Sequence, residues 1–166
     1  QALDGSFSAC SCVASCDDPS YLARSPDRKT LYAVSEKRAE EGASVLAFRC
    51  TDDGSLVYLS RRLVSGDAPC HLALSSDGRF LASAQYATGD IDLFSIAADG
   101  DLNAQIATAR ATGSGPNTTR QKGPHAHWVG FFTSPAQLAV VDLGIDAIEV
   151  YALNPESGLG TGPVQR

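Results

Sequence analysis

The amino-acid sequence predicts an all-β protein, a β-propeller fragment with about three four-stranded antiparallel blades. Three observations support this prediction. An internal repeat runs through the chain, each copy holds four short apolar or alternating segments separated by turn residues, and no segment has the i, i+3, i+4, i+7 spacing of a long amphipathic helix. Four antiparallel strands per repeat of this length are typical of a propeller blade, whereas a sandwich or barrel does not require copies in the same register.

The repeat sets the expected blade boundaries. The segment from Pro19 to Val34 aligns without a gap with that from Pro69 to Ala84, 50 residues later, and a third copy starts at Pro124, a further 55 residues along. We expect blades over residues 19–66 and 69–113, an incomplete blade over 124–166, and the outer strand of a preceding blade over 1–16. Propellers close with about four to eight blades, so the chain is expected to be a fragment whose partners are the missing blades of a parent chain.

The second copy shows the expected elements in order. Strands are predicted over 71–74, 80–86, 91–97 and 102–109, with Ser76-Asp77-Gly78 and Asp99-Gly100 as hairpin turns. In the first copy, Ser44 to Phe48 matches Asp90 to Phe94, and the run from Glu36 to Gly42 is predicted to be a charged loop. In the third copy the pattern reaches Ala147 to Tyr151 and Pro155 to Leu159.

Composition and charge exclude several classes of function. The chain has 166 residues, 43% of them hydrophobic, and a net charge of -6. Without a basic stripe we expect no nucleic-acid partner and no membrane-surface role, and no apolar run approaches the roughly 20 residues of a membrane span. The start has neither an initiating Met nor a leader, so we expect the natural N-terminus to be missing.

The five cysteines are expected to be free thiols. Cys10, Cys12, Cys16, Cys50 and Cys70 form an odd set without the spacing of a zinc site. We therefore expect no metal or other cofactor. Reduced thiols without a leader favour a cytoplasmic protein.

A glycine- and proline-rich loop, Gly113 to Pro124, runs directly into two histidines. If a strand follows Pro124, then His125 and His127 lie on one face, and the loop delivers Arg120 and Gln121 just before them. Two imidazoles and a guanidinium on one surface suit an anion. The alternative is that these are polar residues at a strand start, satisfied by neighbouring carbonyl groups.

Several segments together carry a family resemblance. They are Pro19-Ser-Tyr-Leu-Ala, Ala68-Pro-Cys-His71, Gly113-Ser-Gly-Pro-Asn, Arg120-Gln-x-x-Pro-His-x-His127 and Val141-Asp-Leu-Gly-Ile-Asp146. The chain resembles the seven-bladed lactonase family, which includes propeller-type 6-phosphogluconolactonases and a fungal carboxy-cis,cis-muconate cyclase. The resemblance implies about three blades of an expected seven, a pocket at one mouth of the central channel, and later blades that add Arg and Glu residues. One departure is Arg28, which stands where the first hairpin would usually have Gly.

The repeat places further side chains at this mouth. Tyr21 and His71 are equivalent positions, and His127 falls at or one residue from the same place. Glu36, Tyr86 and Asp142 each end the second strand of their copy, so we expect them to reach the same end of the channel. The alternatives are a solvated charge for Glu36, packing between blades for Tyr86 and turn capping for Asp142.

The expected reaction is hydrolysis of an anionic sugar lactone. We expect His127 to be the general base, because imidazole titrates near neutral pH, and Arg120 to hold the anion with its planar fork. His125 and His71 are expected to donate to the oxyanion or to orient the substrate, with Glu36 as a further catalytic candidate. The binding candidates beside Arg120 are Gln121, Tyr86, Asp142 and Tyr21. The alternatives are muconate cycloisomerisation and a non-catalytic binding scaffold.

Overall fold

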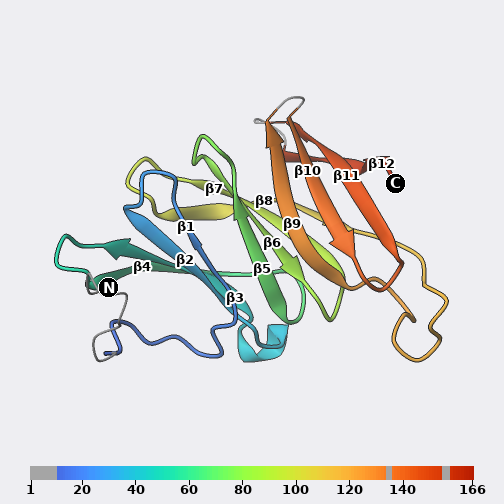
Figure 1. Ribbon diagram of the computed structural model, residues 1–166, viewed down its shortest axis with the longest axis horizontal. Helices are drawn as coiled ribbons and strands as arrows, with labels where there is room; N and C mark the ends of the chain where they lie inside the picture. The colour runs from blue at the N-terminus through green and yellow to red at the C-terminus, as the bar shows by residue number, and fades with distance from the viewer. Residues whose placement is uncertain (1–10, 134–135, 155–157) are drawn as a thin grey trace, which may run out of the picture.

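The computed structural model describes residues 11–133, 136–154 and 158–166 as three four-stranded antiparallel sheets (Figure 1). The first sheet holds β1 (Leu22–Arg24), β2 (Thr30–Ser35), β3 (Ser44–Cys50) and β4 (Leu56–Leu63). The second holds β5 (Pro69–Leu74), β6 (Phe80–Gln85), β7 (Asp90–Ile96) and β8 (Leu102–Arg110). The third holds β9 (Ala126–Thr133), β10 (Ala136–Asp142), β11 (Ala147–Asn154) and β12 (Gly158–Gln165).

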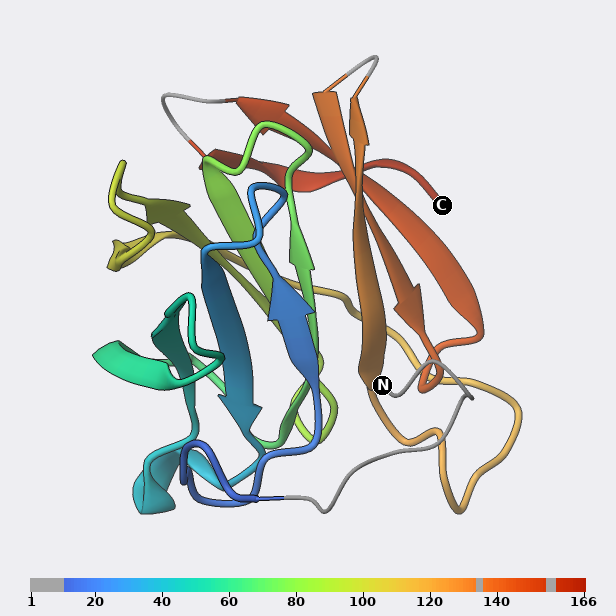
Figure 2. The same cartoon turned by 60° about the vertical axis from the view of Figure 1, so that its left-hand side comes forward.

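The three sheets are arranged as successive propeller blades. Within each sheet the strands lie in sequence order, and the first strands pack side by side, β1 against β5 and β5 against β9 (Figures 1 and 2). The last strands of the blades, β4, β8 and β12, also neighbour one another. The blades therefore fan out from an axis lined by β1, β5 and β9, which confirms the all-β propeller prediction.

Two details differ from the expected boundaries. The third copy, expected to be incomplete, forms a full four-stranded sheet because residues 158–165 pair with β11 as β12. The sequence of β12, Gly-Leu-Gly-Thr-Gly-Pro-Val-Gln, has no alternation that would have indicated a strand. Of the outer strand expected over residues 1–16, residues 1–10 lie outside the described part, and 11–16 have no strand assignment.

Helical structure is almost absent from the described residues. A single 3₁₀ turn, Ala39–Glu41, replaces part of the charged loop predicted over residues 36–42, and the side chain of Asp67 caps it by accepting from Ala39 N at 2.7 Å. The described part of the chain contains no helix with the length and hydropathy to span a membrane. Cys12, Cys16, Cys50 and Cys70 are free thiols as expected, and Cys10 lies outside the described residues.

The turn between β1 and β2 and the turn between β5 and β6 share one hydrogen-bond pattern. Ser75 Oγ donates to Asp77 Oδ1 at 2.7 Å, and the same oxygen accepts from Arg79 N at 3.1 Å. These bonds, led by that from Ser75, lower the pKa of Asp77 to about 2. In the first blade Arg28 adopts φ 64°, the left-handed conformation that glycine would supply more easily, so the turn forms without its usual glycine.

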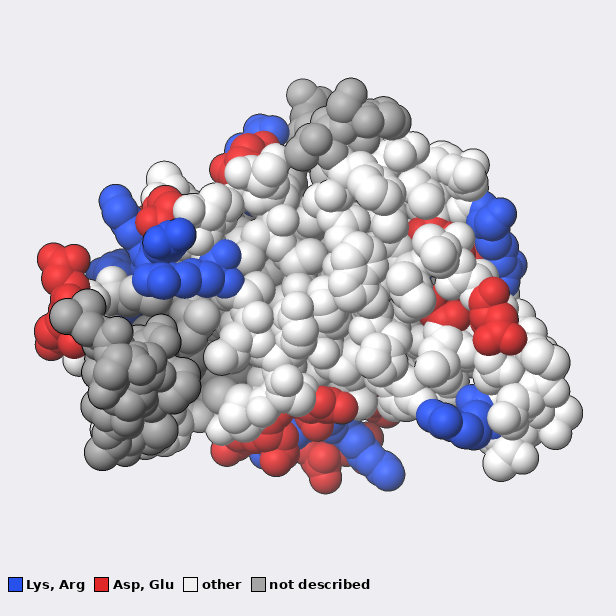
Figure 3. Space-filling view, viewed as in Figure 1, with Lys and Arg blue, Asp and Glu red and all other residues white. Residues whose placement is uncertain are grey.

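Two apolar layers join the blades. Between the first and second blades, Tyr32, Leu81 and Phe94 are fully buried, and between the second and third, Leu93 and Tyr151 are buried. Burying one such side chain contributes about 1.5–3 kcal/mol, so the stacking of blades is the main stabilising contact. The surface over the innermost strands carries few charges, which gather instead at the edges of the molecule (Figure 3).

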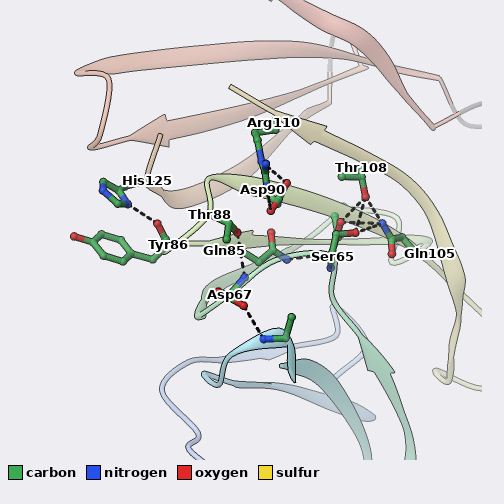
Figure 4. A network of polar contacts seen from close by, with 12 residues as sticks. Ser65, Asp67, Gln85, Tyr86, Thr88, Asp90, Gln105, Thr108, Arg110 and His125 are labelled. Atoms are coloured by element: carbon green, nitrogen blue, oxygen red, sulfur yellow. Dashed lines mark hydrogen bonds and ion pairs between the residues drawn. The ribbon is translucent and has the colours of Figure 1, made fainter. Parts of the chain in front are cut away.

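A buried carboxylate, that of Asp92, adds a polar centre to the first layer, and its side-chain donors Gln85, Gln105 and Thr108 are labelled in Figure 4. Asp92 is fully buried and accepts from Ser65 N and Thr108 Oγ1, both at 2.6 Å. Gln105 Nε2 donates to it at 2.9 Å and Gln85 Nε2 at 3.2 Å. Burial raises the pKa of Asp92, and the four donors offset part of the cost of a buried charge.

Candidate functional site

The innermost strands of the second and third blades begin with matching irregularities. The pairing of β5 with β6 skips Cys70, and the pairing of β9 with β10 skips His127. The residues that follow, His71 and Trp128, therefore occupy equivalent positions. The sequence placed His127 at or one residue from the position of His71, and the structure puts it one residue earlier, at the bulge.

A row of rings lines the inner edges of the three blades. The centroids of Tyr21 and His71 are 4.2 Å apart, and those of His71 and Trp128 are 5.7 Å apart. His71 is half-buried and its Nδ1 accepts from Val129 N at 3.4 Å. Burial, together with the charge of His127, lowers the pKa of His71, so this imidazole stays neutral at pH 7.

His125 and Tyr86 form a stacked pair across the boundary between the second and third blades (Figure 4). Their rings are 4.8 Å apart with an interplanar angle of 18°, and His125 Nδ1 lies 2.7 Å from the carbonyl oxygen of Tyr86. The ring of His127 meets Tyr86 edge-on at 5.7 Å. Tyr86 thus contacts both histidines that the sequence predicted on one face, His125 by stacking and His127 only by an edge contact.

Asp142 fixes the backbone that carries His125. Its Oδ1 accepts from His125 N and Gly144 N, both at 2.8 Å, and from Ile145 N at 3.2 Å. Its Oδ2 is buried without a hydrogen-bond partner among the described residues. The contacts of Asp142 are those of a turn-capping residue. Its carboxylate contributes to the site by holding the backbone of His125 in place.

Glu36 occupies the position in the first blade that Tyr86 occupies in the second. Glu36 N donates to Asp18 O, as Tyr86 N donates to Ala68 O. The Glu36 side chain is exposed, and its charge, after burial, contributes to raising the pKa of Cys70 to about 11. Cys70 is therefore a protonated thiol at neutral pH, which does not favour covalent catalysis.

Gln121 ties the loop to the turn between β10 and β11. Its Oε1 accepts from Asn117 N at 2.8 Å, and its Nε2 donates to Leu143 O at 2.8 Å and to the carboxylate of Asp146. The amide, expected to bind substrate, is buried and has partners on both atoms within the protein. These contacts are those of a residue that holds the loop over residues 113–124 against the β10–β11 turn.

Arg120 is exposed and lines a recess of its own. The recess has a volume of about 220 Å³ and is lined by Asn117, Arg120, Gln121, Leu143 and Asp146, with no histidine. Leu143 connects the two places, because its N donates to His125 O at 3.0 Å. The recess of Arg120 and the backbone of His125 therefore share one neighbour, Leu143, in the turn after β10.

Sequence reasoning missed Trp128 and two glycines that shape the site. A β-carbon at Gly144 would lie 2.0 Å from Gly123 O and 2.7 Å from His125 N, and Gly89 crowds Pro124 in the same way. Trp128 could have been found by aligning the third copy two residues later, on Ala126 instead of Pro124. Among the described residues, no group of three or more His, Cys, Asp or Glu side chains is placed to hold a metal ion.

Comparison with known proteins agrees with this architecture. Residues 2–165 match the model of the family described as lactonase, 7-bladed beta-propeller. A 6-phosphogluconolactonase of Bacillus subtilis is 32% identical over 142 residues, which cover 85% of this chain and 40% of the relative. A 6-phosphogluconolactonase of Formosa agariphila is 28% identical over 143 residues, covering 86% of this chain and 40% of the relative.

A solved structure shows the same arrangement of blades. The periplasmic gluconolactonase of Pseudomonas aeruginosa superposes with a TM-score of 0.78 at 27% identity, covering 90% of this chain and 46% of that one. The chain spans about 40% of the length of the curated relatives it matches. By its family match and its fold, the chain belongs to the seven-bladed β-propeller lactonases.

Proposed function

We propose that the full-length protein that carries this chain hydrolyses a sugar lactone, 6-phosphogluconolactone to 6-phosphogluconate, as in the pentose phosphate pathway. The observation that carries this proposal is the cluster of His71, His125 and His127 at one mouth of the channel, in which Tyr86 contacts His125 and His127, and His127 acts electrostatically on His71. The relatives named 6-phosphogluconolactonase support the choice of substrate.

The proposed reaction is attack of water on the lactone carbonyl, assisted by a histidine. Because Val129 N donates to His71 Nδ1, the neutral ring of His71 carries its hydrogen on Nε2. This N–H is a donor for the oxyanion that develops when water adds to the carbonyl carbon. The lowered pKa of His71 keeps the ring in this neutral form.

The phosphate of the substrate would be held by Arg120. The surface over the innermost strands carries few charges, so an anion must be bound by residues at the mouth (Figure 3). Arg120 is exposed in a recess whose lining residue Leu143 also contacts the backbone of His125, and a guanidinium can hold a phosphate through two parallel hydrogen bonds. The expected ligand is therefore a small anionic lactone.

An assay with two substrates tests this function. The full-length protein is incubated side by side with 6-phosphogluconolactone and with carboxymuconate, and ring opening and ring closure are followed. We expect acceleration of lactone opening above the spontaneous rate. The Lys29→Ala variant, changed in an exposed turn at the other end of the first blade, is the control and should match the wild type. Turnover of the muconate alone would identify a cycloisomerase, and no turnover of either would indicate a binding scaffold.

A further inference from the structure

The contact between His125 and the Tyr86 carbonyl sets where the hydrogen of the imidazole lies. His125 Nδ1 is 2.7 Å from Tyr86 O. A carbonyl oxygen can only accept, so Nδ1 must carry a hydrogen. In the neutral ring the other nitrogen, Nε2, then holds a lone pair, which makes His125 a proton acceptor at Nε2.

The position of this ring is fixed from two blades. Tyr86, from the second blade, stacks on it at 4.8 Å, and Asp142, from the third, accepts from its backbone N at 2.8 Å. Gly144 lies against the backbone N of His125, and Gly89 lies against Pro124, the residue before it, so closely that neither glycine has room for a β-carbon. A proton acceptor held in one tautomer and one place needs little reorganisation before reaction.

His127 lacks these constraints. Its side chain is exposed, its ring meets Tyr86 only by an edge contact at 5.7 Å, and no hydrogen bond to its ring nitrogens occurs within the described ranges. Neither tautomer of His127 is therefore selected. The sequence favoured His127 as the base, and the contacts favour its neighbour two residues earlier.

We propose that His125 is the general base of the lactonase reaction and His71 its hydrogen-bond donor. Nε2 of His125 takes a proton from water as the water oxygen bonds to the lactone carbonyl carbon, and the oxyanion accepts from His71 Nε2–H. When the bond between that carbon and the ring oxygen breaks, the proton on His125 passes to the leaving oxygen. This assignment rests on the proposed function. The titratable groups around His125 are Tyr86, which stacks on its ring, and Asp142, which accepts from its backbone N; His127 contacts the other partner of the stack, Tyr86.

Two variants of the full-length protein separate the histidines. In His125→Asn the amide N can replace Nδ1 and keep the bond to Tyr86 O, but no atom accepts the proton. His127→Asn is the matched comparison at the neighbouring histidine. We expect kcat on 6-phosphogluconolactone to fall by about 10²-fold or more in His125→Asn and by a clearly smaller factor in His127→Asn. The decline of the wild-type rate at acid pH should disappear from the residual activity of His125→Asn, because only the neutral imidazole accepts a proton.

The outcomes are distinguishable. Wild-type protein without lactonase activity would overturn the proposed function and the base together. An active wild type with His125→Asn within a few-fold of it, or with an unchanged pH profile, would overturn the base alone. The ¹⁵N chemical shifts of the imidazole nitrogens test the tautomers without substrate: a protonated Nε2 in neutral His125 would contradict the proposal.

Discussion

Gly89 lies against Pro124 so closely that a β-carbon on residue 89 would be 2.4 Å from Pro124 Cβ and 3.0 Å from its carbonyl carbon. Gly89 belongs to the turn after β6, and Pro124 directly precedes His125. This contact fixes where the first strand of the third blade begins relative to the second blade. The position of His125 therefore depends on the absence of a side chain at Gly89 in the neighbouring blade.

Replacing Gly89 by Ala should disturb the site as well as the fold. The residue has φ 73°, so a side chain costs about 1–2 kcal/mol in backbone strain, and the contact with Pro124 adds a shift of the His125 backbone. We expect the free energy of unfolding to fall by more than the about 1–2 kcal/mol of the backbone strain alone. We also expect a reduced kcat in the full-length protein. Denaturant unfolding and steady-state kinetics measure both effects.

Gly54→Ala is the matched control. Gly54 has φ 85°, but nothing lies within 4 Å of its added β-carbon. It should show the backbone strain alone and leave kcat unchanged. If Gly89→Ala and Gly54→Ala gave the same loss of stability and the same kcat, the contact with Pro124 would not position the site.

Asp92→Asn should destabilise the contact between the first two blades. Four groups donate to this carboxylate, including Ser65 N and Thr108 Oγ1, and an amide would turn an N–H toward at least one of them. We expect a loss of about 1.5–3 kcal/mol in the free energy of unfolding, the range for hydrogen bonds to a buried charge. Asp52→Asn, at an exposed turn, is the control for the charge change. Equal stability of the two variants would mean that the buried carboxylate contributes nothing as an ion.

His71 predicts a pH dependence of stability. The pKa of His71 is lowered by burial and by the charge of His127, so the folded state binds this proton less readily than the unfolded state. Its contribution to the free energy of unfolding is present above the ordinary imidazole value of about 6.5 and falls as the pH drops below it. The variant His71→Phe keeps a ring between Tyr21 and Trp128 but does not titrate.

Unfolding midpoints of the wild type and His71→Phe should therefore diverge on acidification, with the wild type losing more stability. Parallel curves from neutral to mildly acid pH would show that His71 titrates alike in the two states.

Arg120→Ala should weaken binding more than chemistry. Loss of a bidentate contact to phosphate should raise KM for the phosphorylated lactone by about 10-fold or more, with little effect on a non-phosphorylated lactone. Lys122→Ala removes a nearby charge without the planar fork and should have a smaller effect. A uniform effect of Arg120→Ala on both substrates would assign Arg120 to the loop structure and not to the phosphate.

The sequence alone predicted the blades because their signals are local. The hairpin at Asp77 needs a Ser and an Asp two residues apart, and the repeat shows the same pair at Ser25 and Asp27, with Arg28 in place of the glycine. Strands predicted over 71–74 and 102–109 agree with β5 and β8 within two residues. Alternation and turn residues carry this information without reference to the rest of the chain.

The sequence could name candidate residues for the site, but not the contacts that they make. Which of His125 and His127 is held depends on a bulge, and a bulge is set by pairing between strands. The direction of the Gln121 amide and the three bonds to Asp142 Oδ1 depend on how a long loop folds back on the β10–β11 turn. Neither leaves a signal in residue spacing.

The central claim is that this mouth directs water to a lactone carbonyl, and hydrolysis in ¹⁸O-labelled water tests it most directly. Full-length protein is mixed with 6-phosphogluconolactone, and both the initial rate and the position of the label are determined. Attack at the carbonyl carbon predicts opening above the spontaneous rate, with one ¹⁸O in the new carboxylate and none in the hydroxyl formed from the ring oxygen. A rate no higher than the spontaneous one, or label in that hydroxyl, would contradict it.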